Sequence, residues 1–209
     1  YASIGTPQQI QELGDYIKQG VTSFKFFLNR PEYESMFGAP SADDGMLYTA
    51  WKKLRELGGM PMCHCENFEI ARMITEDLKS KKPYPGMWND CRPGFCEYES
   101  MQKAAFIAKI ARSPVYIVHM SIGDGVDIAM RARQEGVEMY IETCPHYLTL
   151  QANDPKLLLL EKVCPPLRTK ADNEKLWWGL KAGYIQCIGT DHTANKKDMK
   201  MGKGDFWSI

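Results

Sequence analysis

Short runs rich in β-branched and aromatic residues alternate along the chain with longer segments that mix apolar and polar residues. The short runs are typical of β-strands, and we expect five of them, at 21–28, 60–66, 115–120, 137–143 and 184–190. The longer segments predict α-helices at 6–19, 41–57, 67–79, 97–112, 124–134 and 172–182.

Capping residues mark several ends of the predicted helices. Thr6 precedes Pro7, which is the order of an N-cap followed by proline at the first helical position. Gly20 ends this first helix, and Asn67 is placed to cap the helix after the second strand. A loop rich in proline and glycine is expected at 83–94.

Strands that alternate with helices imply βαβ units and a parallel sheet. Five such units in 209 residues fit either a doubly wound sheet or most of a (β/α)8 barrel, since a complete barrel takes about 250 residues. The alternation does not choose between these folds. The chain shows no repeat, low-complexity segment or linker, so we expect 1–209 to form one α/β domain.

Four polar residues stand where parallel α/β folds carry their active sites, at the carboxyl ends of strands. Lys25 lies among phenylalanines in the first predicted strand, and Asp191 directly follows the fifth. His64 and His119 lie near the ends of the second and third strands. Side chains at such ends converge, so the four predict a metal-binding catalytic site.

Side-chain alternation along each strand refines this expectation. It puts His119 on the same face as Ile117. It also turns Cys63 and Cys65 away from the site that His64 faces.

Each of these residues also has a purely structural interpretation. A lone histidine on a strand is usually a hydrogen-bonded core or surface residue, and a lysine in an apolar strand can extend to the surface. A different metal site, made of thiolates, is conceivable, although no zinc-ribbon pattern surrounds its cysteines. It would use Cys63, Cys65, Cys91 and Cys96.

Composition and charge narrow the range of partners. Lys and Arg number 26, as do Asp and Glu, so a net charge of zero gives no reason to expect nucleic acid. No apolar run is long enough to span a membrane. Seven scattered cysteines favour a reduced, cytoplasmic protein. The start at Tyr1 and the end at Ile209 lead us to expect a segment of a longer polypeptide.

Six short motifs, in one order, point to a single family. They are GVTSFK at 20–25, HCEN at 64–67, VHMS at 118–121, ETCPHYL at 142–148, CPPLR at 164–168 and GTDH at 189–192. With them the chain resembles the cyclic amidohydrolases, which include dihydropyrimidinases, hydantoinases, allantoinases and dihydroorotases. The dihydropyrimidinase and hydantoinase branch is the most similar.

The resemblance implies an α/β fold, a (β/α)8 TIM-type barrel of the amidohydrolase superfamily, with a β-sandwich built from the two chain ends. This chain would hold about strands four to eight of the barrel. Residues 1–209 would then be a partial barrel domain that lacks the N-terminal strands and the sandwich.

The resemblance also implies a site with two divalent metal ions, usually zinc. Lys25 would be carboxylated to a carbamate that bridges both ions, and His64 and His119 would bind the second. Asp191 would bind the first ion and move the proton to the leaving nitrogen. Water held between two such ions loses a proton near neutral pH and becomes the nucleophile.

The implied reaction is hydrolysis of a small cyclic amide, a dihydropyrimidine or a hydantoin, by a homo-oligomer, commonly a tetramer. Cys164 stands where relatives bind the amide edge of the substrate through the backbone. Alternatives are an allantoinase or dihydroorotase-like activity, or a non-catalytic relative such as the neuronal collapsin-response-mediator proteins. All four ligand positions in this span are intact, which favours an enzyme.

Two departures from the family pattern bear on the substrate and the metal site. The family's His-x-His pair is absent from these 209 residues. The family's tyrosine five residues after the lysine is replaced by Arg30, with Tyr33 nearby. A guanidinium can stabilise an oxyanion or bind a substrate carboxylate, so we expect Arg30 to contact the substrate and to change its preference.

Overall fold

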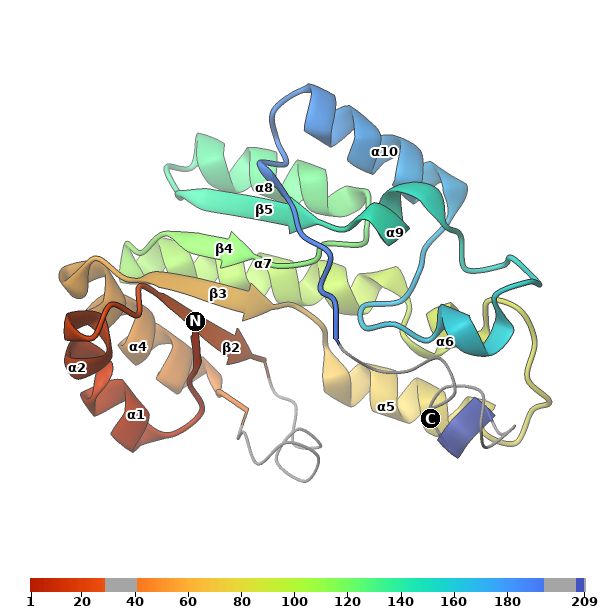
Figure 1. Ribbon diagram of the computed structural model, residues 1–209, viewed down its shortest axis with the longest axis horizontal. Coiled ribbons are helices and arrows are strands. Elements are labelled where there is room, and N and C mark those ends of the chain that lie inside the picture. The colour runs from red at the N-terminus through yellow and green to blue at the C-terminus, as the bar shows by residue number, and fades with distance from the viewer. Residues whose placement is uncertain (29–40, 194–205, 209) are drawn as a thin grey trace.

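Six parallel strands form one sheet in the computed structural model, which describes residues 1–28, 41–193 and 206–208. The strands stand in the sheet in chain order, from β1 to β6, and Figure 1 shows β2 to β5 side by side in this order. They are β1 (Ala2–Ser3), β2 (Ser23–Phe27), β3 (Met60–His64), β4 (Val115–Ile117), β5 (Met139–Thr143) and β6 (Cys187–Ile188). The five predicted strands are therefore confirmed, and β1 adds a short one before them.

Helices connect successive strands and pack on one another in the same order as the strands (Figure 1). The main ones are α4 (Asp44–Leu57), α5 (Phe68–Leu78), α7 (Gly94–Ala111), α8 (Asp124–Gln134) and α10 (Lys170–Lys181). Shorter ones are α1 (Pro7–Gln11), α2 (Leu13–Lys18), α6 (Met87–Cys91), α9 (Pro145–Thr149), and the 3₁₀ helices η1 (Leu158–Glu161) and η2 (Phe206–Ser208).

The strictly sequential strand order decides between the two folds that the sequence left open. A doubly wound sheet reverses its strand order at a switch point, which places helices on both faces. Here every strand is added on the same side of its predecessor. Because parallel crossovers are right-handed, the connecting helices then fall on one face, which is the arrangement of a barrel wall.

The helix-facing side of the sheet forms the core. Phe26, Cys63 and Ile117 are neighbours across β2, β3 and β4, and all are buried. Phe26 meets Trp51 of α4 edge to face, with ring centroids 6.1 Å apart. The apolar residues of the strands therefore anchor the helix layer and leave the opposite face to polar side chains.

Local signals set most helix ends as predicted, with two corrections. The side chain of Thr6 caps α1 and that of Asn67 caps α5. The helix predicted at 6–19 is instead two helices that meet at Glu12. The helix predicted at 41–57 begins later, because the carboxylate of Asp43 accepts a hydrogen bond from the amide of Met46.

All seven cysteines are free thiols. Within the described part of the chain, no helix combines the length and the apolar character that crossing a membrane requires.

Candidate functional site

The face of the sheet opposite the helices, called the open face below, gathers the polar residues of neighbouring strands. Lys25 is the register partner of Met62, and Met62 is the partner of Tyr116. Residues side by side in a parallel sheet point to the same face, and so do residues two apart along a strand. Tyr116 is in turn the partner of Tyr140, two residues before Glu142. Lys25, His64, Tyr116 and Glu142 therefore share this face.

Two histidines meet at the carboxyl ends of β3 and β4. The Nδ1 atom of His64 lies 3.0 Å from the Nε2 atom of His119, and the rings meet edge to face with centroids 4.7 Å apart. Only 3% of His64 and 4% of His119 is exposed. The sequence prediction that these two side chains converge is confirmed.

The backbone of His119 explains how its side chain reaches this face. The prediction that His119 shares the face of Ile117 is wrong, because Ile117 pairs with Cys63 on the buried side. Strand β4 ends at Ile117, and His119 has a φ of 43°, in the left-handed region. Such a residue interrupts strand alternation. Cys63 does lie under the helices, as predicted.

A buried carboxylate backs the first histidine. Oε2 of Glu66 lies 3.4 Å from Nε2 of His64, and it accepts a hydrogen bond of 2.7 Å from Arg92. Burial alone would raise the pKa of Glu66, but Arg92 and His64 hold it well below its usual value. Sequence analysis did not single out Glu66 or Arg92, although a charged residue directly after an apolar strand is a usable signal.

A second buried ion pair fixes the loop after His119. Glu97 accepts hydrogen bonds from the backbone amide of Ser121 at 2.7 Å, from its hydroxyl, and from Arg168 at 3.2 Å. Burial raises the pKa of Glu97, and the Arg168 charge and the Ser121 bonds oppose this. Arg168 also donates to the carbonyl oxygen of Arg92, so the two ion pairs are connected.

Lys25 is a buried amine. Desolvation lowers its pKa to about 8, although Cys63 and Asp191 partly oppose the shift. Its Nζ lies 5.2 Å from the centre of the Phe27 ring, which in turn lies 5.7 Å from the His64 ring. Roughly one amine in ten is therefore uncharged at pH 7, and the Phe27 ring lies between the amine and His64.

Asp191 follows β6 at the edge of the described sheet, where it is exposed. It too has a left-handed backbone, with a φ of 47°. Partial desolvation raises the pKa of its carboxyl, Lys25 opposes the shift, and Glu142 adds to it. Asp191 is thus electrostatically linked to Lys25, but it does not join the histidines in a group of three His, Cys, Asp or Glu ligands among the described residues.

The histidine pair suits a divalent cation. Two nitrogens that each lie about 2.0–2.1 Å from one tetrahedral zinc ion are roughly 3.3 Å apart, close to the 3.0 Å between His64 and His119. Metal-binding histidines commonly donate their other ring N–H to a carboxylate, and Glu66 is placed to accept it. His64 and His119 therefore fit a metal ion.

Other predicted site residues are less well connected. Cys164 is half-buried between η1 and α10, and no described contact links it to either histidine. Arg30, with Tyr33, lies outside the described residues. The conceivable thiolate site gains no support, because the described residues hold no group of three metal-ligating side chains. Its four members are the buried Cys63, Cys65, Cys91 and Cys96.

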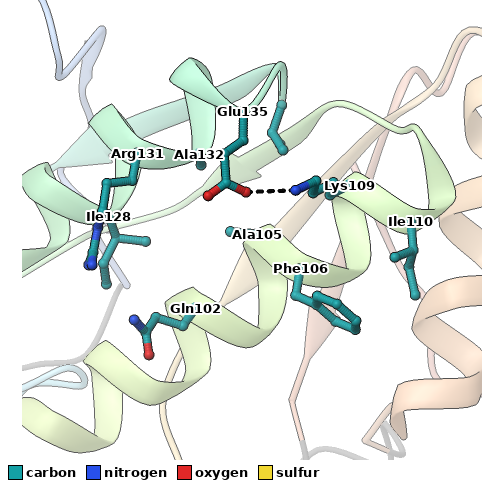
Figure 2. A pocket seen from close by; sticks show the side chains of 10 residues that line it. Gln102, Ala105, Phe106, Lys109, Ile110, Ile128, Arg131, Ala132 and Glu135 are labelled. Atoms are coloured by element: carbon teal, nitrogen blue, oxygen red, sulfur yellow. Dashed lines mark hydrogen bonds and ion pairs between the residues drawn. The ribbon is translucent and has the colours of Figure 1, made fainter.

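A hollow on the outer surface is separate from these residues. It lies between α7 and α8, with a volume of about 300 Å³, and Figure 2 shows the Lys109–Glu135 ion pair above it and the apolar Phe106 beside it. None of the predicted ligands lines it. It opens on the helix layer, so it is not the candidate site.

No protein-family model matches the chain. Allantoinase of Deinococcus radiodurans is 33% identical over 206 residues, which are 98% of this chain and 45% of the relative. D-hydantoinase of Geobacillus stearothermophilus is 34% identical over 215 residues, 98% of this chain and 44% of the relative. The chain thus spans a little under half the length of these relatives.

Solved structures agree with these relatives. D-hydantoinase from a Bacillus sp. AR9 superimposes with a TM-score of 0.85 at 31% identity, over 98% of this chain and 46% of that one. Dihydropyrimidinase from Brevibacillus agri NCHU1002 gives a TM-score of 0.85 at 28% identity, over 98% and 45%. Together with the strand order and the paired histidines, these similarities show that the chain belongs to the cyclic amidohydrolase family, as part of its α/β barrel.

Proposed function

We propose that the polypeptide containing this chain hydrolyses a C–N bond in a small cyclic amide. The observation that carries the proposal is the contact between His64 and His119 on the open face of the sheet. Relatives named allantoinase, D-hydantoinase and dihydropyrimidinase support the substrate class, a hydantoin, dihydropyrimidine or allantoin ring. A homo-oligomer, with 1–209 as a partial barrel domain, is part of the same proposal.

Four residues would hold the metal ions in this proposal. They are Lys25, His64, His119 and Asp191, with zinc as the metal. Bound divalent ions would polarise the amide carbonyl and lower the pKa of water. The chain contributes two imidazoles that are buried away from bulk water. It also contributes the carboxylate of Glu66, which lies on the far side of His64 and orients its ring.

Lys25 would act as a carbamate. Its uncharged amine can attack carbon dioxide, forming an N–C bond and releasing one proton. The product is an anion with two oxygens, whereas a lysine ammonium cannot bind a cation. Burial supports this role because it lowers the pKa of the amine to about 8.

Asp191 would carry a proton between the attacking water and the ring nitrogen that leaves. Its raised pKa, caused by desolvation, suits a group that must both accept and release a proton. Cys164, through its backbone, and Arg30 would contact the substrate. A non-catalytic relative is the alternative, and the buried, carboxylate-backed histidine pair argues against it.

The test uses the full-length polypeptide and its His64→Ala and Lys25→Ala variants. Wild type should contain tightly bound zinc and should open hydantoin, dihydrouracil or allantoin. Both variants should lose metal and activity, and short-chain carboxylic acids should partly restore the Lys25→Ala variant. His146→Ala, on α9, serves as the control and should retain both. Wild-type metal content and rates in both site variants would disprove the proposal.

A further inference from the structure

We infer that Glu66, held by Arg92, is a positioning residue that sets the orientation and tautomer of His64 for metal binding. The inference rests on the proposed function. It adds a role for two residues that do not themselves contact metal or substrate.

The hydrogen-bonding capacity of the groups fixes the tautomer. A neutral imidazole has one donor nitrogen and one acceptor nitrogen, and an ionised carboxylate only accepts. Glu66 lies 3.4 Å from Nε2 of His64, so the proton belongs on Nε2. The lone pair of His64 then lies on Nδ1, the atom that faces His119.

Arg92 keeps the Glu66 carboxylate charged and in place. Its guanidinium donates to Oε2 of Glu66 at 2.7 Å and lies over the rings of Phe68 and Trp88, 4.6 and 4.9 Å from their centres. Glu66 is 1% exposed and Arg92 is 6% exposed, so solvent does not screen the pair. The backbone carbonyl oxygen of Arg92 also accepts a hydrogen bond of 2.5 Å from Arg168, which holds the backbone of Arg92 in place.

The geometry argues for more than a structural ion pair. Arg92 bonds to Oε2, and this same oxygen is the one beside His64. The other oxygen, Oε1, is buried and has no hydrogen-bond partner among the described residues. The carboxylate is therefore oriented so that one oxygen connects the guanidinium to the imidazole, as in a carboxylate–histidine–metal triad.

The experiment measures metal binding in the full-length protein. Zinc affinity is determined by chelator competition, and the ligand field is read from the visible spectrum of the cobalt-loaded protein. Glu66→Gln should lower affinity about tenfold to a hundredfold and should alter the cobalt spectrum. Glu161→Gln is the matched control, since this buried carboxylate accepts from the amide of Gly86 instead of from a histidine. It should leave affinity and spectrum unchanged.

A second variant covers the case in which Glu66→Gln does not fold. Arg92→Lys keeps the positive charge but loses the planar fork, so it should weaken zinc binding in the same direction and less strongly. Wild-type affinity and spectrum in every folded variant of the pair would overturn the inference. The His64→Ala variant separates the two ideas: if it loses metal while the Glu66 and Arg92 variants retain it, the proposed function stands and the positioning role fails.

Discussion

The Nδ1 atom of His64 lies 3.0 Å from the Nε2 atom of His119, and the left-handed backbone of His119 makes this contact possible. His64 lies within β3, whereas His119 lies two residues past the end of β4. A residue with a φ of 43° turns its side chain out of the alternating pattern. The backbone amide of His119 donates to Glu142 at 3.2 Å, which helps to hold this conformation.

Two substitutions at His119 separate its backbone role from its ligand role. Asparagine adopts left-handed conformations routinely, whereas an ordinary L-residue pays about 1–2 kcal/mol. We expect His119→Asn and His119→Ala both to lose metal affinity. In the metal-free state, His119→Asn should be about 1 kcal/mol more stable than His119→Ala, as measured by urea denaturation. Equal stabilities would show that the left-handed conformation is not retained.

Much of the fold could be predicted because each main element has its own sequence pattern. The strands that form β2 to β6 are apolar runs, and the main helices have capping residues or glycines at their ends. The missed elements, β1, α6, α9, η1 and η2, have two to five residues each. An apolar repeat is recognisable only over about 11–18 residues for a helix and about 4–8 for a strand, so segments this short carry too little of the pattern, and tertiary contacts decide their conformation.

The convergence of His64 and His119 was predictable, but the groups that support them were not. Strand-end position identifies His64 and His119 without knowledge of contacts, whereas Lys25 is the middle residue of β2 and is marked only as a charged residue among phenylalanines. The partners of the ion pair Arg92–Glu66 are 26 residues apart in the chain, and those of Arg168–Glu97 are 71 apart. Nothing local in the sequence relates such distant charges.

Substituting only one member of the buried ion pair of Glu97 and Arg168 should strongly destabilise the fold. Glu97→Leu leaves the Arg168 charge buried without its carboxylate, which typically costs about 3–5 kcal/mol. The double variant Glu97→Leu/Arg168→Met removes both charges and should recover much of that loss. Urea denaturation of the two single variants and the double variant measures the coupling. Additive losses would mean that the two groups are not coupled.

The thiols in the core should be unreactive. Burial raises the pKa of Cys96 to about 11 and that of Cys144 to about 12. At pH 8 the reactive thiolate would then be roughly one part in a thousand or less. We expect neither cysteine to be alkylated by iodoacetamide in the folded protein, and both to react in urea, as read by peptide mass spectrometry. Rapid labelling of either one in the folded state would contradict this burial.

Gly189 lies against the carboxylate that holds His119. A Cβ at position 189 would lie 2.6 Å from Cδ and 2.7 Å from Oε2 of Glu142. That carboxylate accepts from the Tyr116 hydroxyl at 2.8 Å and from the backbone amide of His119 at 3.2 Å. Glu142 can move away only by weakening these bonds. A side chain at position 189 would therefore displace the Glu142 carboxylate.

We expect Gly189→Ala to lower the zinc affinity of the full-length protein severalfold, because displacing Glu142 loosens the backbone of His119. Shortening the carboxylate in Gly189→Ala/Glu142→Asp should restore part of the loss. The control is Gly14→Ala in α2, where an added Cβ meets nothing within 4 Å. Alanine there should raise the free energy of unfolding by about 0.5–1 kcal/mol and leave metal binding unchanged. Unchanged zinc affinity in Gly189→Ala would show that the Glu142 contact does not position His119.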